Sequence, residues 1–101
     1  MGPHQARVRD THEVSGWRIE FTSSARRRLE RIHPEPRGRI ETAIAALVDD
    51  PRPASAKRLV GRTEYWRIRV GSYRVVYTIE DDRLVILVLT LGHRRDVYRG
   101  L

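Results

Sequence analysis

YWRIRVGSYRVVYTIE, residues 65–80, is the stretch of sequence that decides the fold. Apolar and polar side chains alternate on both sides of Gly71-Ser72, and Trp66, Ile68 and Val70 share one face. A Gly-Ser pair between two alternating runs is typical of the two-residue turn that closes a β-hairpin. The stretch therefore predicts two antiparallel strands, with apolar side chains toward a core and polar side chains on the other face.

The register of this hairpin brings arginines together. Arg67 and Arg69 lie on the polar face of the first strand, and Arg74 lies on the polar face of the second. A tight turn makes Arg69 and Arg74 direct cross-strand neighbours, with Cβ atoms about 5 Å apart. Like charges directly opposite destabilise a sheet, so the pattern indicates a place that binds an anion such as phosphate. The alternative is that Glu64 or Glu80 pairs with these arginines.

The hairpin is the first part of a predicted meander. Asp81-Asp82 is expected to turn the chain again. Residues 84–91 are almost continuously apolar, which is typical of an interior strand covered on both faces. Gly92 is expected to end this strand, and residues 93–101 are too short for a firm assignment, although one turn of helix is possible there.

A strand and two helices are predicted upstream of the meander. Residues 17–22 alternate as in a half-buried strand. Thr22, Ser23 and Ser24 offer caps for a first helix, and Pro34 and Pro36 end that helix and begin a second. Helical spacing of apolar residues supports both helices. It links Ala25, Leu29 and Ile32 in the first, and Ile40, Ala43, Ile44, Leu47 and Val48 in the second. Residues 51–63 are expected to form a loop.

The element order predicts an α+β fold. A strand, two helices and a three-stranded meander form one mainly antiparallel sheet with a helical hairpin on one face. The length of 101 residues allows one domain, which we place at residues 17–101. Residues 1–16 are polar and aperiodic, and we expect them to be a disordered leader or a remnant of cloning.

Composition narrows the classes of function. The chain has 20 Lys plus Arg and 13 Asp plus Glu, for a net charge of +7, and Lys57 is its single lysine. Such a surface attracts polyanions, although it can also serve solubility alone. There is no cysteine, and the four histidines lack the spacing of metal ligands, so we expect neither metal nor cofactor. No apolar run reaches the length of a membrane span, and we expect a cytoplasmic protein.

The C-terminal tail contains further side chains that could act together with these arginines. His93, Arg94, Arg95 and Tyr98 follow the last strand. Guanidinium groups neutralise phosphate, a phenol stacks on bases, and an imidazole moves protons near neutral pH. His93 could equally be an ordinary surface histidine. The sequence offers no pair of histidines and no carboxylate cluster for two metals here, so any RNA cleavage is expected to use the 2′-hydroxyl of the RNA without a metal.

Two separated motifs resemble the RelE-type toxins of the RelE/ParE superfamily. They are YWRIRVGSYRVVY at residues 65–77 and LGHRRDVY at residues 91–98. The strand–helix–helix–meander order is similar as well, and the resemblance covers residues 17–99. It implies a toxin of a bacterial type II toxin–antitoxin module, many members of which cleave mRNA in the ribosomal A site by 2′-hydroxyl attack.

The resemblance also implies partners and site residues. The partners are a partly disordered RelB- or Phd-like antitoxin, mRNA, ribosomal RNA, and operator DNA through the toxin–antitoxin complex. The catalytic positions of the family fall on Arg67, Arg69, Arg74, Arg94, Tyr98 and His93. Additional RNA contacts are expected at Lys57, Arg58 and Arg95.

Two other functions remain open on the same scaffold. One is a ParE-like toxin that poisons DNA gyrase, and the other is a non-catalytic RNA-binding relic. The ParE group tends to lack the full basic and tyrosine set. The combination of arginines with Tyr98 therefore favours the nuclease.

Overall fold

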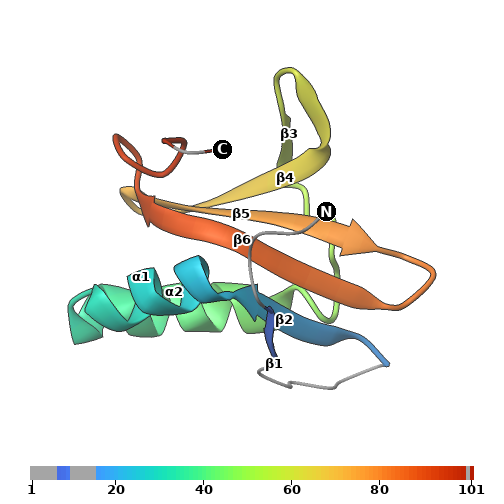
Figure 1. Ribbon diagram of the computed structural model, residues 1–101, viewed down its shortest axis with the longest axis horizontal. Coiled ribbons are helices and arrows are strands. Elements are labelled where there is room, and N and C mark those ends of the chain that lie inside the picture. Colours follow the sequence, from blue (N-terminus) through green and yellow to red (C-terminus); the bar gives the residue numbers. More distant parts are fainter. Residues whose placement is uncertain (1–6, 10–15, 100) are drawn as a thin grey trace.

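The protein is a single twisted sheet with a helical hairpin packed on one face (Figure 1). The computed structural model describes residues 7–9, 16–99 and 101. The strand order is β1-β2-β6-β5-β4-β3. β2 runs parallel to β6, and all other neighbours are antiparallel. The elements are β1 (Arg7–Arg9), β2 (Arg18–Thr22), α1 (Ser23–Arg31), α2 (Pro34–Ala46), β3 (Lys57–Leu59), β4 (Arg62–Val70), β5 (Tyr73–Glu80) and β6 (Val85–His93). This arrangement confirms the predicted α+β fold.

The predicted helical hairpin is confirmed, and its apolar stripes face the sheet. Leu29 of α1 and Ile40 and Ile44 of α2 are buried. They pack in one core with the apolar face of β4 and β5, including Ile68 and Val75. Burial of each large aliphatic side chain contributes about 1.5–3 kcal/mol. Neither helix has the length and apolarity that crossing a bilayer requires.

One threonine joins the first helix to the centre of the sheet. The hydroxyl of Thr22, the N-cap of α1, accepts a hydrogen bond from the N–H of Ala25 at 3.1 Å. The same hydroxyl donates to the carbonyl of Leu89 at 2.6 Å. Leu89 is the extra residue of a β-bulge, where the β5–β6 register shifts. The cap therefore also ties the start of α1 to the bulge of β6.

The prediction of a half-buried strand over residues 17–22 is correct about the strand but wrong about the burial of one face. Glu20 and Thr22, on the face expected to be polar and solvated, are each only 2% exposed. β2 lies between β1 and β6, so it is an interior strand. Its polar residues are held by specific partners. Arg18 lies 3.6 Å from Glu20, and Thr22 bonds to Leu89. Alternation in the sequence cannot reveal these partners.

The sheet has one short strand at each edge that was not predicted. Residues 57–59 of the expected loop form β3, and β4 begins at Arg62 instead of Tyr65. At the other edge Arg7–Arg9 forms β1, which corrects the expectation of a disordered leader for those three residues. The rest of that leader, apart from Gly16, lies outside the described residues. Both short strands are polar in sequence and are defined by pairing with a longer neighbour, which local patterning does not encode.

The last strand and the tail also differ from the prediction. β6 continues through Gly92 to His93. The tail then folds into turns, in which the N–H groups of Asp96 and Val97 donate to the carbonyl of His93 at 2.8 and 3.0 Å. No helix is assigned over residues 94–99. Val97 is fully buried, and the tail lies on the side of the sheet opposite the helices (Figure 1).

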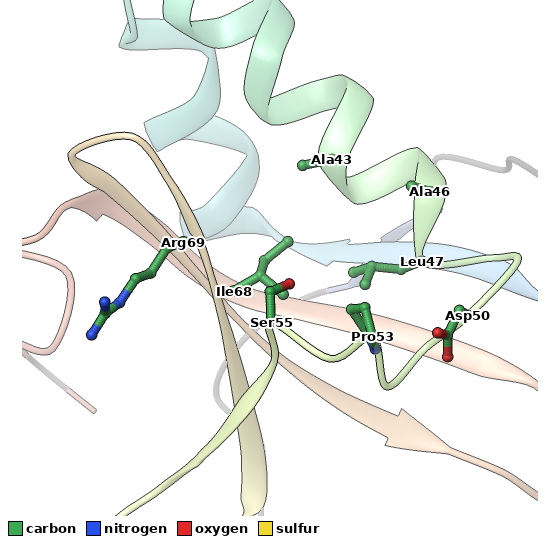
Figure 2. A pocket seen from close by; sticks show the side chains of 8 residues that line it. All are labelled: Ala43, Ala46, Leu47, Asp50, Pro53, Ser55, Ile68 and Arg69. Carbon is green, nitrogen blue, oxygen red and sulfur yellow. The ribbon is translucent and has the colours of Figure 1, made fainter.

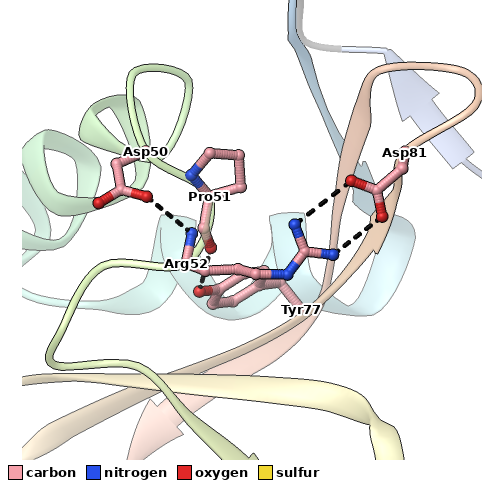
Figure 3. Close-up of polar contacts among 5 residues, drawn as sticks. All are labelled: Asp50, Pro51, Arg52, Tyr77 and Asp81. Carbon is pink, nitrogen blue, oxygen red and sulfur yellow. Dashed lines mark hydrogen bonds and ion pairs between the residues drawn. The ribbon is translucent and has the colours of Figure 1, made fainter.

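The segment after α2 is anchored to β5 by a buried tyrosine. The hydroxyl of Tyr77 donates to the carbonyl of Pro51 at 2.8 Å, and Tyr77 is fully buried. Beside it, Arg52 forms two hydrogen bonds to the carboxylate of Asp81, at 2.8 and 3.3 Å (Figure 3). These contacts fix the chain that leads from α2 into β3.

The Tyr77 anchor predicts a pH-dependent stability. Burial raises the pKa of Tyr77 from 10.0 to about 12. The unfolded chain therefore ionises this phenol at lower pH than the folded chain does. The stabilisation is fully present below pH 10 and is lost as the pH rises toward 12. Near pH 8, Tyr77→Phe should lower the free energy of unfolding by about 1 kcal/mol. In urea titrations this difference should shrink between pH 10 and 12, and a constant difference would contradict the assignment.

Candidate functional site

The hairpin of β4 and β5 has the register predicted from the sequence. Val70 pairs with Tyr73, and Arg69 pairs with Arg74. Gly71 has a φ of +59°, the left-handed conformation that a type II′ turn requires at its first central position. The tight turn therefore places two arginines directly opposite each other on one face of the sheet.

Arg74 lies at the centre of a group of positive charges. Its Nη1 donates to the carbonyls of Gly71 and Tyr73, both at 3.0 Å, which holds the guanidinium against the turn. The pKa of Arg74 is lowered, first by partial burial and then by the charge of Arg69, with smaller effects from Arg67 and Arg94. Tyr98 acts in the opposite direction. We call Arg67, Arg69, Arg74, Arg94 and Tyr98 the basic cluster.

The tail is held at the cluster by the hairpin turn. The N–H of Arg94 donates to the carbonyl of Ser72 at 2.8 Å. Three residues later the buried Val97 fixes the chain, and Tyr98 beside it keeps 42% of its surface exposed. The tail thus presents a guanidinium and an accessible phenol next to the arginines of the strands.

A second like-charged pair extends the cluster toward the sheet edge. Lys57 of β3 pairs with Arg67 of β4, so both lie on the same face as Arg69 and Arg74. Within the described ranges, none of these four cations has a carboxylate within ion-pair distance. The alternative of pairing with a glutamate is not supported. Glu64 makes no such pair there, and Glu80 lies at the far end of β5 with Arg83 at 2.7 Å.

Besides Lys57, three predicted site residues lie outside the basic cluster. His93 pairs with Tyr73, and their rings meet edge to face with centroids 6.0 Å apart. By register, both belong to the opposite side of the sheet from Arg74. Arg58 pairs with Trp66 on that side, and its guanidinium lies 4.9 Å from the Trp66 ring. Arg95 is exposed in the tail, where its N–H donates to Nδ1 of His93 at 3.4 Å.

Two helix arginines that the sequence analysis missed reach the same end of the sheet. Nη1 of Arg39 lies 3.4 Å from the position that a Cβ would take on Gly71. Nη1 of Arg28 lies 3.5 Å from the corresponding position on Gly92. A run of arginines on a helix is most simply a solvated surface, so its approach to a distant strand becomes evident only in three dimensions.

A cavity of about 300 Å³ lies on the other side of β4, between α2 and the segment before β3. It is lined largely by apolar side chains, among them Ala43, Leu47 and Ile68. Figure 2 shows the guanidinium of Arg69 pointing away from this cavity. Arg69 also lines the cavity, so the cavity and the basic cluster meet at this residue.

The basic cluster has the chemistry of a phosphate site. Guanidinium groups form paired, charge-assisted hydrogen bonds to phosphate oxygens, and an anion between Arg69 and Arg74 would relieve their repulsion. The exposed Tyr98 can stack on a base. The cluster consists of four guanidinium groups and a phenol.

Comparisons with known proteins find similarity to toxins of toxin–antitoxin systems. A family model described as the ParE toxin of the type II toxin–antitoxin system parDE matches residues 19–98. Toxin RelG of Mycobacterium tuberculosis is 29% identical over 82 residues, which cover 80% of this chain and 94% of that protein. The mRNA interferase toxin RelE of Escherichia coli is 24% identical over 78 residues, covering 75% of this chain and 81% of that protein.

A solved structure gives the same result for the fold. The toxin–antitoxin complex RelBE2 of Mycobacterium tuberculosis contains a chain with 29% identity and a TM-score of 0.66, and the match covers 78% of this chain and 99% of that chain. This chain therefore belongs to the RelE/ParE superfamily of type II toxins.

The like-charged pair predicts a stabilising substitution within the site. Arg69→Gln removes one of two opposed cations and keeps a long polar side chain on an exposed strand position. The free energy of unfolding should rise by about 0.5 kcal/mol at low ionic strength. The gain should shrink in 1 M salt, because salt screens exposed charges. Urea denaturation at two salt concentrations measures it, and a loss of stability at low salt would show that Arg69 has a favourable partner.

Proposed function

We propose that this chain is the toxin of a type II toxin–antitoxin module and that it cleaves mRNA in the ribosomal A site. The observation that carries the proposal is the convergence of Arg69, Arg67, Arg94 and Tyr98 on Arg74. The name of its relative RelE, an mRNA interferase toxin, supports the same activity. Positioning and charge stabilisation are what such a cluster supplies.

In the proposed reaction the RNA provides its own nucleophile. The 2′-oxygen loses its proton and attacks the adjacent phosphorus, and the bond from phosphorus to the 5′-oxygen breaks. The 5′-oxygen takes up a proton and leaves, so the products are a 2′,3′-cyclic phosphate and a 5′-hydroxyl. Arg69 and Arg74 stabilise the negative charge that builds up on the phosphate oxygens. Tyr98 stacks on a neighbouring base or orients a hydroxyl.

The other predicted residues take different roles in this proposal. Lys57 shares the face of the cluster and is suited to hold the RNA backbone, as is the exposed Arg95. We leave His93 out of the catalytic set, because its ring lies against Tyr73 on the other side of the sheet. Arg58 is left out of the RNA contacts because it stacks on Trp66.

The proposed partners follow from the same reading. A cognate antitoxin, partly disordered and RelB- or Phd-like, binds and neutralises the toxin, as the solved RelBE2 complex suggests. Operator DNA is contacted through the toxin–antitoxin complex. Ribosomal RNA and mRNA are the targets of the free toxin, which acts in the cytoplasm.

A second candidate function has one observation in its favour. The family model that matches residues 19–98 is described as the ParE toxin. A ParE-like gyrase poison on this scaffold would arrest growth with DNA damage signalling and without cleavage of mRNA. Cleavage that depends on translation separates the two candidates.

The test of the proposed function is the Arg74→Ala variant. On induction in bacteria, the wild-type chain should cut translated transcripts and leave matched transcripts without a start codon intact. Arg74→Ala should reduce cleavage by about a hundredfold or more and abolish growth arrest, because it removes the central charge of the site. Cleavage sites mapped by primer extension measure the effect.

Arg27→Ala is the matched control, because it makes the same change of charge at an exposed position on α1. It should keep wild-type cleavage. The urea midpoint of Arg74→Ala should stay close to that of the wild type, because Arg74 lies outside the apolar core. Full toxicity of a folded Arg74→Ala variant, or equal cutting of untranslated transcripts, would contradict the proposal.

A further inference from the structure

Two arginines of the helical hairpin lie close to glycines that neighbour Arg74 in the sheet. Gly71 precedes Arg74 at the turn, and its carbonyl accepts a hydrogen bond from Arg74. Gly92 is the direct cross-strand partner of Arg74 in β6. Arg39 of α2 approaches Gly71 to 3.4 Å, and Arg28 of α1 approaches Gly92 to 3.5 Å, each measured from Nη1 to the site of a Cβ. Both helices thus bring a cation to the end of the sheet where the basic cluster lies, from the face opposite the side chain of Arg74.

Arg28 differs from the other arginines of its helix. Arg26 stacks on the ring of Phe21, with its guanidinium carbon 4.3 Å from the ring centroid. Arg27 and Arg31 are exposed. Arg28 is partly buried, yet in the part of the chain that the structure describes no carboxylate lies within ion-pair distance of it. A guanidinium held beside a strand without a counter-ion is suited to bind an anion that arrives from outside.

Arg39 is a weaker candidate for the same role. It forms an exposed ion pair with Glu35 on its own helix, at 3.3 Å. Such a pair contributes little and exchanges easily with other partners. Arg39 therefore supports the positive charge at the turn, whereas Arg28 has no ion-pair partner among the described residues.

We propose that Arg28 is a further RNA-binding residue, which holds a backbone phosphate next to the phosphate held by the basic cluster. At Gly92, which has no side chain, the guanidinium of Arg28 lies against the end of β6. A single strand of RNA carries a regular row of phosphates, so a strand that crosses Arg74 extends naturally to a cation beside Gly92. The inference rests on the proposed RNA-binding function of the cluster.

The test is binding of a short single-stranded RNA whose 2′-hydroxyls are methylated, so that it cannot be cut. Arg28→Gln should weaken binding about five- to tenfold near 100 mM salt, and the slope of log affinity against log salt should fall by about 0.7, the value for one lost phosphate contact. Arg27→Gln, with the same change of charge on the same helix, should leave the slope unchanged. Fluorescence anisotropy of a labelled oligonucleotide measures both variants.

Two additional variants separate the possible outcomes. Arg28→Lys keeps the charge and should restore most of the affinity if Arg28 contacts a phosphate. Arg74→Ala reports on the basic cluster itself. If Arg74→Ala weakens binding but Arg28→Gln does not, this inference fails and the proposed function stands. If neither variant changes the affinity, the proposed function fails as well.

The comparison of Arg28→Gln with the control Arg27→Gln has two outcomes that would overturn the inference. Equal losses in Arg27→Gln and Arg28→Gln would mean that only the net charge of the helix matters. A loss of antitoxin affinity in Arg28→Gln, with RNA affinity unchanged, would assign Arg28 to the protein partner and would also contradict the inference. Urea midpoints of the variants, expected to stay close to the wild type, confirm that each chain is folded.

Discussion

The cross-strand register of β4 and β5 is the constraint on which the rest of the site depends. Gly71 adopts a left-handed conformation in a two-residue turn, and this fixes Arg69 opposite Arg74. The same register sends Ile68 and Val75 into the core. A shift of one residue would move every arginine to the helix side and every apolar side chain to solvent. The energy of the core therefore enforces the geometry of the basic cluster, including the repulsion between its members.

The tail depends on the same turn. Ser72 accepts the hydrogen bond that positions Arg94, and Val97 is buried immediately before Tyr98. Residues that are far apart in the chain are thus brought to one place by a few local contacts. The site is built from a hairpin, a strand end and the segment after it. The cavity beside α2 lies on the other face and shares Arg69 with the site, while the guanidinium of Arg69 points away from it (Figure 2).

Local patterns predicted the hairpin, its register and the two helices, because alternation and capping depend on neighbours in sequence. The cross-strand pair of Arg69 and Arg74 followed from turn length alone. What depends on long-range pairing was missed. β1 and β3 are too short and polar to be recognised without their partners. The burial of Glu20 reflects an interior position of β2 that no local pattern reveals.

The same limit applies to the site residues. Arg67, Arg69, Arg74, Arg94 and Tyr98 could be grouped from the sequence because they lie on the hairpin or follow the last strand. His93 was assigned to the catalytic set and Arg58 to the RNA contacts through the family resemblance, whereas strand parity turns both to the other face. Arg28 was missed because a helix and the end of β6 meet only in the folded chain.

The central claim is that the basic cluster holds the phosphate at which RNA is cut. The most direct measurement is a cryo-electron microscopy structure of the toxin on a translating ribosome, with the A-site codon protected by 2′-O-methyl groups. The account predicts a backbone phosphate within hydrogen-bond distance of both Arg69 and Arg74, with Tyr98 against a neighbouring base. A well-defined mRNA whose phosphates contact other surfaces, and leave Arg69 and Arg74 without an anion, would contradict it.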